Sequence, residues 1–268
     1  MKVWRTLSGL IAFLFTLSQW GVFTVYGSEM IIPATQITEG IVNVKIATQT
    51  DKRIRIGLYA TGSEEEYFFA YSKEEGEIGI PLIFGNDQYR ISLYEEIDNG
   101  FYSLQGTFNV DLHMDDYNDI YLTSSVIVPW SGAVKTIAKT KLLTKNKNKD
   151  IDKFLAIYRY VVENVLYDKQ KTVSTGYRSS PDATLAADSG ICLDMAVLVA
   201  AMLRCAGIKC KLVYGEANDI EGYHSWNEVY INDQWIVVDP TKDSTFYDMY
   251  KSYKYSKLPQ NYKGTYWF

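Results

Sequence analysis

The chain has 268 residues, of which 47% are hydrophobic and 15% aromatic, so it can bury the core of one large domain or of two ordinary ones. Its formal charge is −5, and it has no concentrated block of Lys and Arg, which argues against a nucleic-acid-binding surface. We therefore expect a packed globular protein of two domains with no nucleic-acid partner.

The N-terminus has the pattern of an export signal. Lys2 and Arg5 precede a long run without charged residues, and Val25 and Gly27 are small enough for a cleavage point after Gly27. The run is also long enough to span a bilayer, so an uncleaved membrane anchor is the alternative. We expect a signal peptide over residues 1–27 and a protein that is secreted or held at the cell surface.

The following region, from residue 31 to about residue 112, predicts an all-β sandwich. Short alternating runs are separated by turn signals: "GIVNVKIAT", "RIRIGLYAT", "EYFFAYS", "EIGIPLI", "QYRISLYEEI" and "YSLQGTFNVDL". A turn is expected at Asp98-Asn99-Gly100, and Tyr89 is a candidate tyrosine corner. The pattern resembles the immunoglobulin-like modules that accompany many secreted bacterial enzymes, and we expect such a module over residues 28–115. That resemblance implies no function by itself.

The span from residue 113 to residue 150 changes character and indicates a domain boundary. An acidic stretch, "HMDDYNDIYL", is followed by a basic one, "KTKLLTKNKNKD". His113 and its acidic neighbours could be called a metal cluster, but a solvated linker explains them better. We expect no metal site here.

From Asp150 onward the pattern predicts helices and then an antiparallel sheet. Apolar residues recur at helical spacing after Asp150, the expected N-cap, and a loop is expected over residues 167–190. A second helix, apolar nearly all round, is expected from Cys192 to Cys205 and ends at Gly207. The strand-like runs "KCKLVYGEA", "YHSWNEVYI" and "QWIVVDP" follow, so residues 116–268 predict an α+β domain.

The cysteine count limits what disulfides can do in this fold. There are three, Cys192, Cys205 and Cys210, and an odd number leaves at least one thiol unpaired unless it pairs between chains. A bridge between Cys205 and Cys210 across the Gly207 turn would leave Cys192 as the free thiol. The bridge requires Cα atoms within about 7 Å.

Cys192 stands where a thiol can be activated. It follows Ser189-Gly190, an expected cap and turn, so its sulfur lies at a helix N-terminus, where exposed N–H groups and the macrodipole favour a thiolate. The alternative is that a free cysteine packs as a small apolar side chain, and this is our interpretation of Cys205 and Cys210. For Cys192 the strands that follow favour the reactive interpretation.

Those strands predict a hairpin with a tight turn at Asn232-Asp233. With a two-residue loop, Trp226 faces Asp239, so His224 and Asp239 share a face as diagonal neighbours. A shift of one residue would separate them, and a cross-strand polar pair without a chemical role is the alternative. A cysteine nucleophile, its base and the carboxylate that orients the base require this arrangement.

Several stretches of residues 150–242 resemble the transglutaminase-like superfamily: "VVENVLYD", "DATL", "SGICLDMAVLVAAMLRCAGIKCKLVYG" and "HSWNEVYINDQWIVVDPT". The resemblance implies the core shared with papain-type cysteine proteases, in which helices pack on an antiparallel sheet. It also implies that Cys192 is the nucleophile, His224 the base and Asp239 the orienting carboxylate in acyl transfer from a carboxamide. The backbone N–H of Cys192 would help to hold the oxyanion.

Two aromatic residues are further candidates for substrate binding under this resemblance. Tyr177 is a candidate second oxyanion donor, and Trp226 either walls the site or packs beneath His224. No loop has the pattern of a calcium site, so neither metal nor cofactor is expected.

The activity itself has several possible outcomes. Transglutaminase, deamidase and peptidase outcomes on protein or peptide substrates, including cell-wall or surface ones, all fit the motif. The competing hypothesis is a catalytically silent cell-surface binding module, supported by the tyrosine-rich tail "FYDMYKSYKYSKLPQNYKGTYWF". An accessible Cys192 would support the enzyme and a buried one the binding module.

Overall fold

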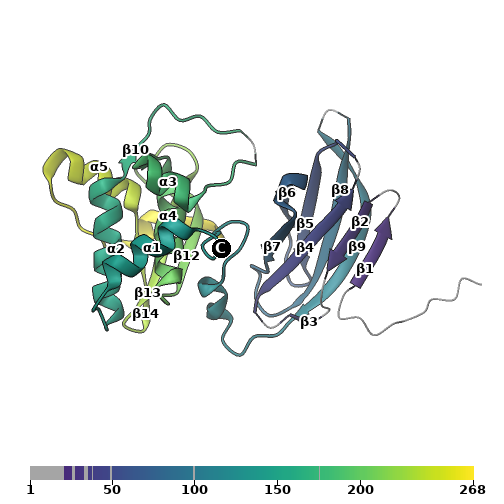
Figure 1. Ribbon diagram of the computed structural model, residues 1–268, viewed down its shortest axis with the longest axis horizontal. Coiled ribbons are helices and arrows are strands. Elements are labelled where there is room, and N and C mark those ends of the chain that lie inside the picture. Colours follow the sequence, from purple (N-terminus) through teal and green to yellow (C-terminus); the bar gives the residue numbers. More distant parts are fainter. Residues whose placement is uncertain are drawn as a thin grey trace, which may run out of the picture.

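The computed structural model describes residues 21–25, 28–32, 36–37, 39–48, 50–98, 100–174 and 176–268. The predicted signal peptide lies largely outside these residues, although Gly21–Val25 within it form strand β1. Two parts of the chain stand beside each other: strands in purple and blue on one side, and helices with the later strands on the other (Figure 1). Among the described residues, no helix has the length and apolar character needed to cross a membrane.

The first part consists of two sheets. One has the order β1-β2-β4-β7, from β1 (Gly21–Val25), β2 (Ser28–Ile32), β4 (Ile41–Thr48) and β7 (Glu77–Pro81). The other has the order β3-β9-β8-β5-β6, from β3 (Gln36–Ile37), β9 (Phe101–Leu112), β8 (Gln88–Asp98), β5 (Ile54–Ala60) and β6 (Tyr67–Tyr71). All pairings are antiparallel except that of β3 with β9. Alternate residues of both sheets, such as Val44 and Ile91, are buried in one core.

The strands predicted from alternating runs are confirmed as β4 to β9. The turn between β8 and β9 is also confirmed, and Gly100 adopts φ +86, which favours glycine. Tyr89 forms the predicted corner: its buried hydroxyl donates to the carbonyl of Gly85 at 2.6 Å and accepts the N–H of Phe84 at 2.9 Å. These bonds tie the start of β8 to the loop that follows β7.

The second part contains a four-stranded antiparallel sheet of order β14-β13-β12-β15. Its strands are β12 (Cys210–Ala217), β13 (His224–Ile231), β14 (Gln234–Val238) and β15 (Tyr262–Trp267). Its helices are α1 (Val134–Thr144), α2 (Asp150–Asn164), α3 (Pro181–Ala187), α4 (Cys192–Cys205) and α5 (Pro240–Tyr250). A short parallel pair, β10 (Leu166–Tyr167) with β11 (Ser189–Gly190), also belongs to this part. Three short 3₁₀ helices complete the elements of the chain: η1 (Lys73–Glu75) between β6 and β7, η2 (Tyr117–Leu122) and η3 (Pro259–Asn261).

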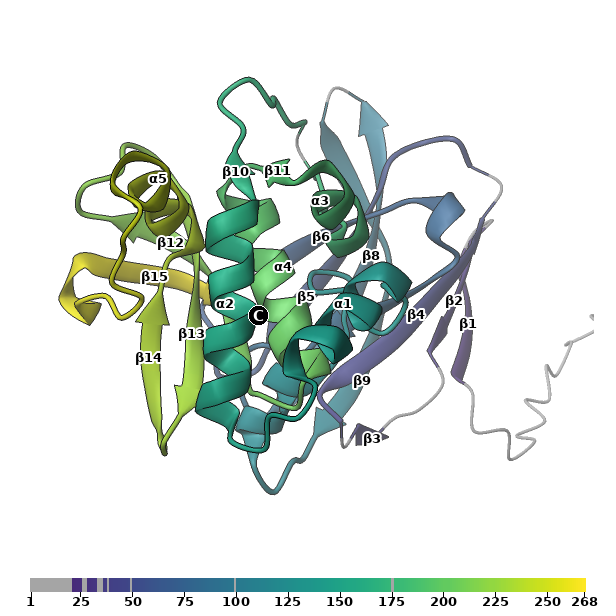
Figure 2. The same ribbon diagram turned by 60° about the vertical axis from the view of Figure 1, so that its left-hand side comes forward.

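Helix α4 is the centre of this part. It packs on β12 and β13 on one side and on α1, α2 and α3 on the other (Figure 2). From Asp194 to Arg204 every residue of the helix is buried, which explains why its sequence is apolar nearly all round. The predicted α+β arrangement of helices on an antiparallel sheet is confirmed.

Several elements differ from the sequence-based expectation. The expected boundary contains helix α1, the expected loop contains α3, and the tyrosine-rich tail contains the end of α5 and strand β15. Helix α3 begins with a signal that we missed: Ser180 caps it by accepting the N–H of Ala183, and Pro181 occupies its first turn. The N-cap of α2 is Lys149 instead of Asp150, which is the first helical residue.

A buried arginine joins three distant segments of the chain. The guanidinium of Arg204 donates from Nε to the carbonyl of Cys210 at 2.9 Å, from Nη1 to Thr123 at 2.9 Å and from Nη2 to Phe268 at 2.6 Å. Burial lowers the pKa of Arg204 to about 10, so the side chain keeps its charge at neutral pH. The segment after η2, the start of β12 and the last strand therefore converge on one fixed cation.

The two parts contact each other through aromatic and charged side chains. The ring of Tyr67 on β6 meets Tyr266 edge-on at 4.7 Å between centroids and Phe268 at 5.2 Å. The Tyr266 hydroxyl donates to Glu65 at 3.0 Å, and Arg178 pairs with Glu75. The sheets of the first part thus border the final strand of the second.

Candidate active site

Cys192 is the first residue of α4 and is half-buried. The predicted Ser189-Gly190 cap is wrong, because Ile191 is the N-cap and its N–H donates to the Asp194 carboxylate at 2.9 Å. Gly190 instead permits a close approach, since a Cβ there would lie 2.5 Å from that of Asp194. Glycine therefore lets the chain pass close to Asp194 just before the sulfur.

The hairpin that carries the other two candidates has the predicted register. Ile231 pairs with Gln234, and Asn232 and Asp233 adopt φ +52 and +60, as a tight two-residue turn requires. His224 begins β13, and Asp239 follows the end of β14 as the N-cap of α5, where it accepts the N–H of Lys242 at 3.1 Å. The hairpin therefore fixes one side chain and the helix start fixes the other.

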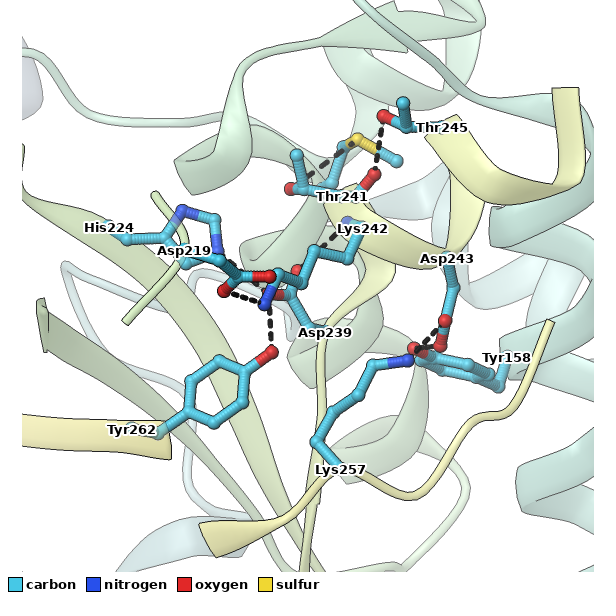
Figure 3. A network of polar contacts seen from close by, with 11 residues as sticks. Tyr158, Asp219, His224, Asp239, Thr241, Lys242, Asp243, Thr245, Lys257 and Tyr262 are labelled. Atoms are coloured by element: carbon cyan, nitrogen blue, oxygen red, sulfur yellow. Dashed lines mark hydrogen bonds and ion pairs between the residues drawn. The ribbon is translucent and has the colours of Figure 1, made fainter. Parts of the chain in front are cut away.

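His224 and Asp239 form a buried hydrogen-bonded pair. The imidazole Nε2 lies 2.9 Å from Asp239 Oδ2, and the two side chains are 3% and 0% exposed (Figure 3). Burial alone would lower the pKa of His224, but hydrogen bonds to Asp239 and Cys192 and their negative charges raise it to about 9. The imidazole therefore interacts with both Asp239 and Cys192. The structure thus brings the three predicted residues together.

Trp226 lies beneath this pair. Its ring is 1% exposed and stacks on His224, with centroids 6.2 Å apart and planes at 25°. On its other side it packs against Tyr262 at 5.1 Å. Trp226 therefore supports the imidazole from within and presents almost no surface to solvent.

Tyr177 belongs to a second polar cluster, centred on Asp194. Its hydroxyl donates to Asp194 Oδ1 at 2.7 Å, and Lys171 Nζ lies 2.7 Å from both the Tyr177 oxygen and Asp194 Oδ2. Asp194 is fully buried and stands two residues after Cys192. The Tyr177 hydroxyl therefore binds Asp194 on helix α4, the helix that begins with Cys192.

Two further groups beside the site were missed by sequence reasoning. The Tyr262 hydroxyl donates to Asp239 Oδ2 at 3.0 Å, and the Tyr158 hydroxyl donates to Asp243 at 2.6 Å, where Lys257 also pairs (Figure 3). Tyr262 lies in the tail that we interpreted by composition. The alternation in "NYKGTYW" is the signal that could have identified its strand.

The bridge between Cys205 and Cys210, which the sequence left open, does not form, and all three cysteines are free. The two thiols point to different surroundings. Cys205 faces Thr140 and Lys141 on α1, whereas Cys210 is buried and donates toward the carbonyl of Lys211 at 3.7 Å. Burial raises the pKa of Cys205, and it raises that of Cys210 to about 12, so both are poor nucleophiles at neutral pH.

Within the part of the chain that the structure describes, no group of three His, Cys, Asp or Glu side chains is arranged to hold a metal ion. His113 and its acidic neighbours are included in that statement.

Comparison with known proteins finds a family match over part of the chain. The family model of the transglutaminase-like superfamily matches residues 137–240. No curated protein matches the sequence significantly.

Solved structures that match the chain include a candidate cysteine protease from Cytophaga hutchinsonii, at 19% identity and TM-score 0.46, covering 82% of this chain and 72% of that one. The periplasmic domain of TgpA from Pseudomonas aeruginosa has 15% identity and TM-score 0.40, covering 75% and 91%. Legionella pneumophila LapG has 16% identity and TM-score 0.31, covering 49% and 81%. All three identities are below 25% and all three TM-scores are below 0.5, so the proposal about function rests on the family match.

Proposed function

We propose that the chain is an acyltransferase or hydrolase acting on peptide or protein carboxamides, because residues 137–240 match the transglutaminase-like superfamily, whose members are thiol enzymes. Cys192 is the nucleophile, His224 the base and Asp239 the carboxylate that orients the imidazole. The observation that carries the proposal is the 2.9 Å bond between His224 and Asp239 beside a half-buried thiol at a helix N-terminus. The silent binding module required a buried Cys192, so the exposure of this residue favours the enzyme.

The reaction begins from a thiolate paired with an imidazolium. Because Asp239 and Cys192 raise the pKa of His224 to about 9, the imidazole holds a proton at neutral pH. The Cys192 sulfur attacks the carboxamide carbon, and the first N–H groups of α4, which lack intrahelical acceptors, lie where the oxyanion develops. The C–N bond then breaks, His224 gives its proton to the leaving ammonia or amine, and a thioester remains.

The second half of the reaction removes the acyl group from sulfur. Neutral His224 takes a proton from an incoming amine or water, which attacks the thioester carbon and returns the thiolate. An amine gives a cross-link, whereas water gives deamidation of a glutamine side chain or cleavage of a peptide bond. Asp239 holds the imidazole with Nε2 inward through both halves, so that Nδ1 faces the sulfur.

The proposal also assigns the domains and the location. A signal peptide over residues 1–27 directs the chain out of the cytoplasm, an immunoglobulin-like sandwich spans 28–115 and the catalytic domain spans 116–268. The two sheets and the corner at Tyr89 support the sandwich. Cleavage after Gly27 would remove β1 and leave β2 as the edge of its sheet, and N-terminal sequencing of the exported protein tests this.

A single incubation tests the activity. The exported protein is mixed with glutamine-containing peptides and a labelled primary amine, and the products are weighed by mass spectrometry. Amine incorporation, conversion of glutamine to glutamate, or chain cleavage each identifies one outcome, and all three should vanish in Cys192→Ala.

A labelling experiment tests the nucleophile. Iodoacetamide at about pH 6 should label Cys192 well before Cys205 or Cys210, because an unperturbed thiol titrates only at about pH 8.5. Equal slow labelling of all three thiols would overturn the assignment of the nucleophile.

A further inference from the structure

We propose that Tyr262, on the last strand of the sheet, is a positioning residue for this site: its hydroxyl holds the Asp239 carboxylate and limits how tightly that carboxylate binds the His224 imidazolium. This inference rests on the proposed function and assigns a residue outside the segment matched by the superfamily. Tyr262 acts through Asp239 and touches neither the sulfur nor the reacting carbonyl.

The geometry places two donors on one oxygen. Asp239 Oδ2 accepts hydrogen bonds from His224 Nε2, at 2.9 Å, and from the Tyr262 hydroxyl, at 3.0 Å (Figure 3). The other carboxylate oxygen, Oδ1, accepts the backbone N–H of Lys242. The carboxylate is fully buried, so these groups take the place of water. A hydroxyl that shares Oδ2 with the imidazole draws off part of the negative charge that the imidazolium would otherwise receive in full.

The sequence brings Tyr262 to this position through a close approach of two strands. Gly215 on β12 pairs with Gly264 on β15, and a Cβ on Gly215 would lie 2.1 Å from the carbonyl of Lys263. The register of the two strands shifts between Tyr214 and Gly215, and Ala217 then pairs with Tyr262. The paired glycines therefore allow β15 to lie close enough for the tyrosine to reach the start of α5.

The tyrosine ring is held as firmly as its hydroxyl. It packs at 5.1 Å against Trp226, within a small apolar cluster of Val213, Trp226, Val237 and Trp267 on the outer face of the sheet. The Lys242 ammonium lies 5.1 Å from the centre of the ring. Burial, together with the charge of Asp239, raises the pKa of Tyr262, so its hydroxyl stays protonated and able to donate at physiological pH.

The titratable groups around the pair come from several elements. Besides Tyr262, they are Cys192 on α4, Asp219 before β13, Lys242 and Asp243 on α5, and Tyr158 on α2. Asp219 is paired with Lys242, and Asp243 with Lys257. A change confined to the Tyr262 hydroxyl leaves these groups and their pairs in place.

The test measures the protonation of His224 directly by NMR. The chain has two histidines, so His113 serves as an internal reference, and the measurement does not depend on turnover. In Tyr262→Phe, Oδ2 offers its whole charge to the imidazolium, and the pKa of His224 should rise by about half a unit. Tyr266→Phe is the matched control, since it removes a hydroxyl from the same strand that also donates to a carboxylate at 3.0 Å.

Two further variants keep the proposal falsifiable. Replacing Tyr262 with 3-fluorotyrosine retains the ring and makes the hydroxyl a stronger donor, so the pKa of His224 should fall. In a protein that already carries Asp239→Asn, the change Tyr262→Phe should no longer shift the pKa of His224. Equal titration curves for Tyr262→Phe, Tyr266→Phe and the parent protein, with only a loss of thermal stability, would overturn the positioning role. An absence of acyl transfer in all of these proteins would instead count against the proposed function and leave the titration result standing.

Discussion

Two buried aspartates of the second part, Asp194 and Asp239, have the same kinds of donor. Each accepts one backbone N–H at the start of a helix, one tyrosine hydroxyl and one cationic side chain. The cation is Lys171 at Asp194 and the imidazole of His224 at Asp239. Both carboxylates are fully buried, so the clusters differ mainly in the proton affinity of that cation.

This difference separates a structural cluster from a chemical one. Although burial opposes both charges, pairing raises the pKa of Lys171 and lowers that of Asp194, so the pair stays ionised across the physiological range. The pKa of His224, in contrast, is raised only to about 9, within reach of proton exchange with a substrate. One cluster holds the loop before α3 to the helix of Cys192, and under the proposed function the other gives and takes a proton.

The largest expected effect comes from Asp239→Asn. The amide cannot stabilise the imidazolium, and it favours the wrong tautomer, so the rate of acyl transfer should fall by about 10³- to 10⁴-fold. Above pH 9, where the imidazole is neutral, the thermal midpoint should hardly change, because the amide oxygen still accepts the N–H of Lys242. Pre-steady-state trapping of the thioester measures the first effect and calorimetry the second. A rate within ten-fold of the parent would remove Asp239 from the mechanism.

Asp194→Asn should affect the stability of the fold more than the rate of acyl transfer. Lys171 loses its counter-charge, and the buried amide must place its NH₂ against groups that also donate. The free energy of unfolding should fall by about 3 kcal/mol, as expected when a buried carboxylate loses the charge that pairs with a partly exposed lysine. Urea denaturation measures this, with Asp239→Asn as the matched variant. If Asp239→Asn cost more stability than Asp194→Asn, the division into structural and chemical clusters would be wrong.

The pH dependence of stability should distinguish the two cations. Because the pKa of His224 is raised above its unfolded value of about 6.5, its contribution is complete below pH 6.5 and is lost as the pH rises through about 9. The loss should be about 3 kcal/mol between these values. In a plot of the free energy of unfolding against pH, His224→Gln should flatten the curve over this range. Lys171→Met should lower the free energy of unfolding at every pH in the range without changing the slope. Parallel curves for His224→Gln and the parent would show that the imidazole is not charged in the folded state.

The smallest effect is expected for Tyr177→Phe. It removes one donor from Asp194 but leaves Lys171 and the N–H of Ile191, so unfolding should become easier by about 1 kcal/mol. The NMR titration of His224 should be unchanged. A shift as large as that expected for Tyr262→Phe would mean that the two clusters are electrostatically coupled.

Local patterns in the sequence were sufficient for much of this site. The tight turn at Asn232-Asp233 determined the register that brings His224 near Asp239, and the apolar run ending at Gly207 marked helix α4. The partners of Asp194 and Asp239 were not predicted, because both tyrosines arrive from segments that looked irregular. Strand β15 pairs with β12 across a long separation, and no local period records such a pairing.

The fork of Arg204 bears on how this protein can be dissected. Its three carbonyl partners lie at Thr123, Cys210 and Phe268, and two of these fall outside residues 137–240. A fragment trimmed to those limits would keep the guanidinium beside Cys210 but strip away two acceptors, and it would also lose Tyr262. A fragment that keeps all three acceptors of the Arg204 guanidinium must include both Thr123 and Phe268. A fragment of residues 116–268 meets this condition.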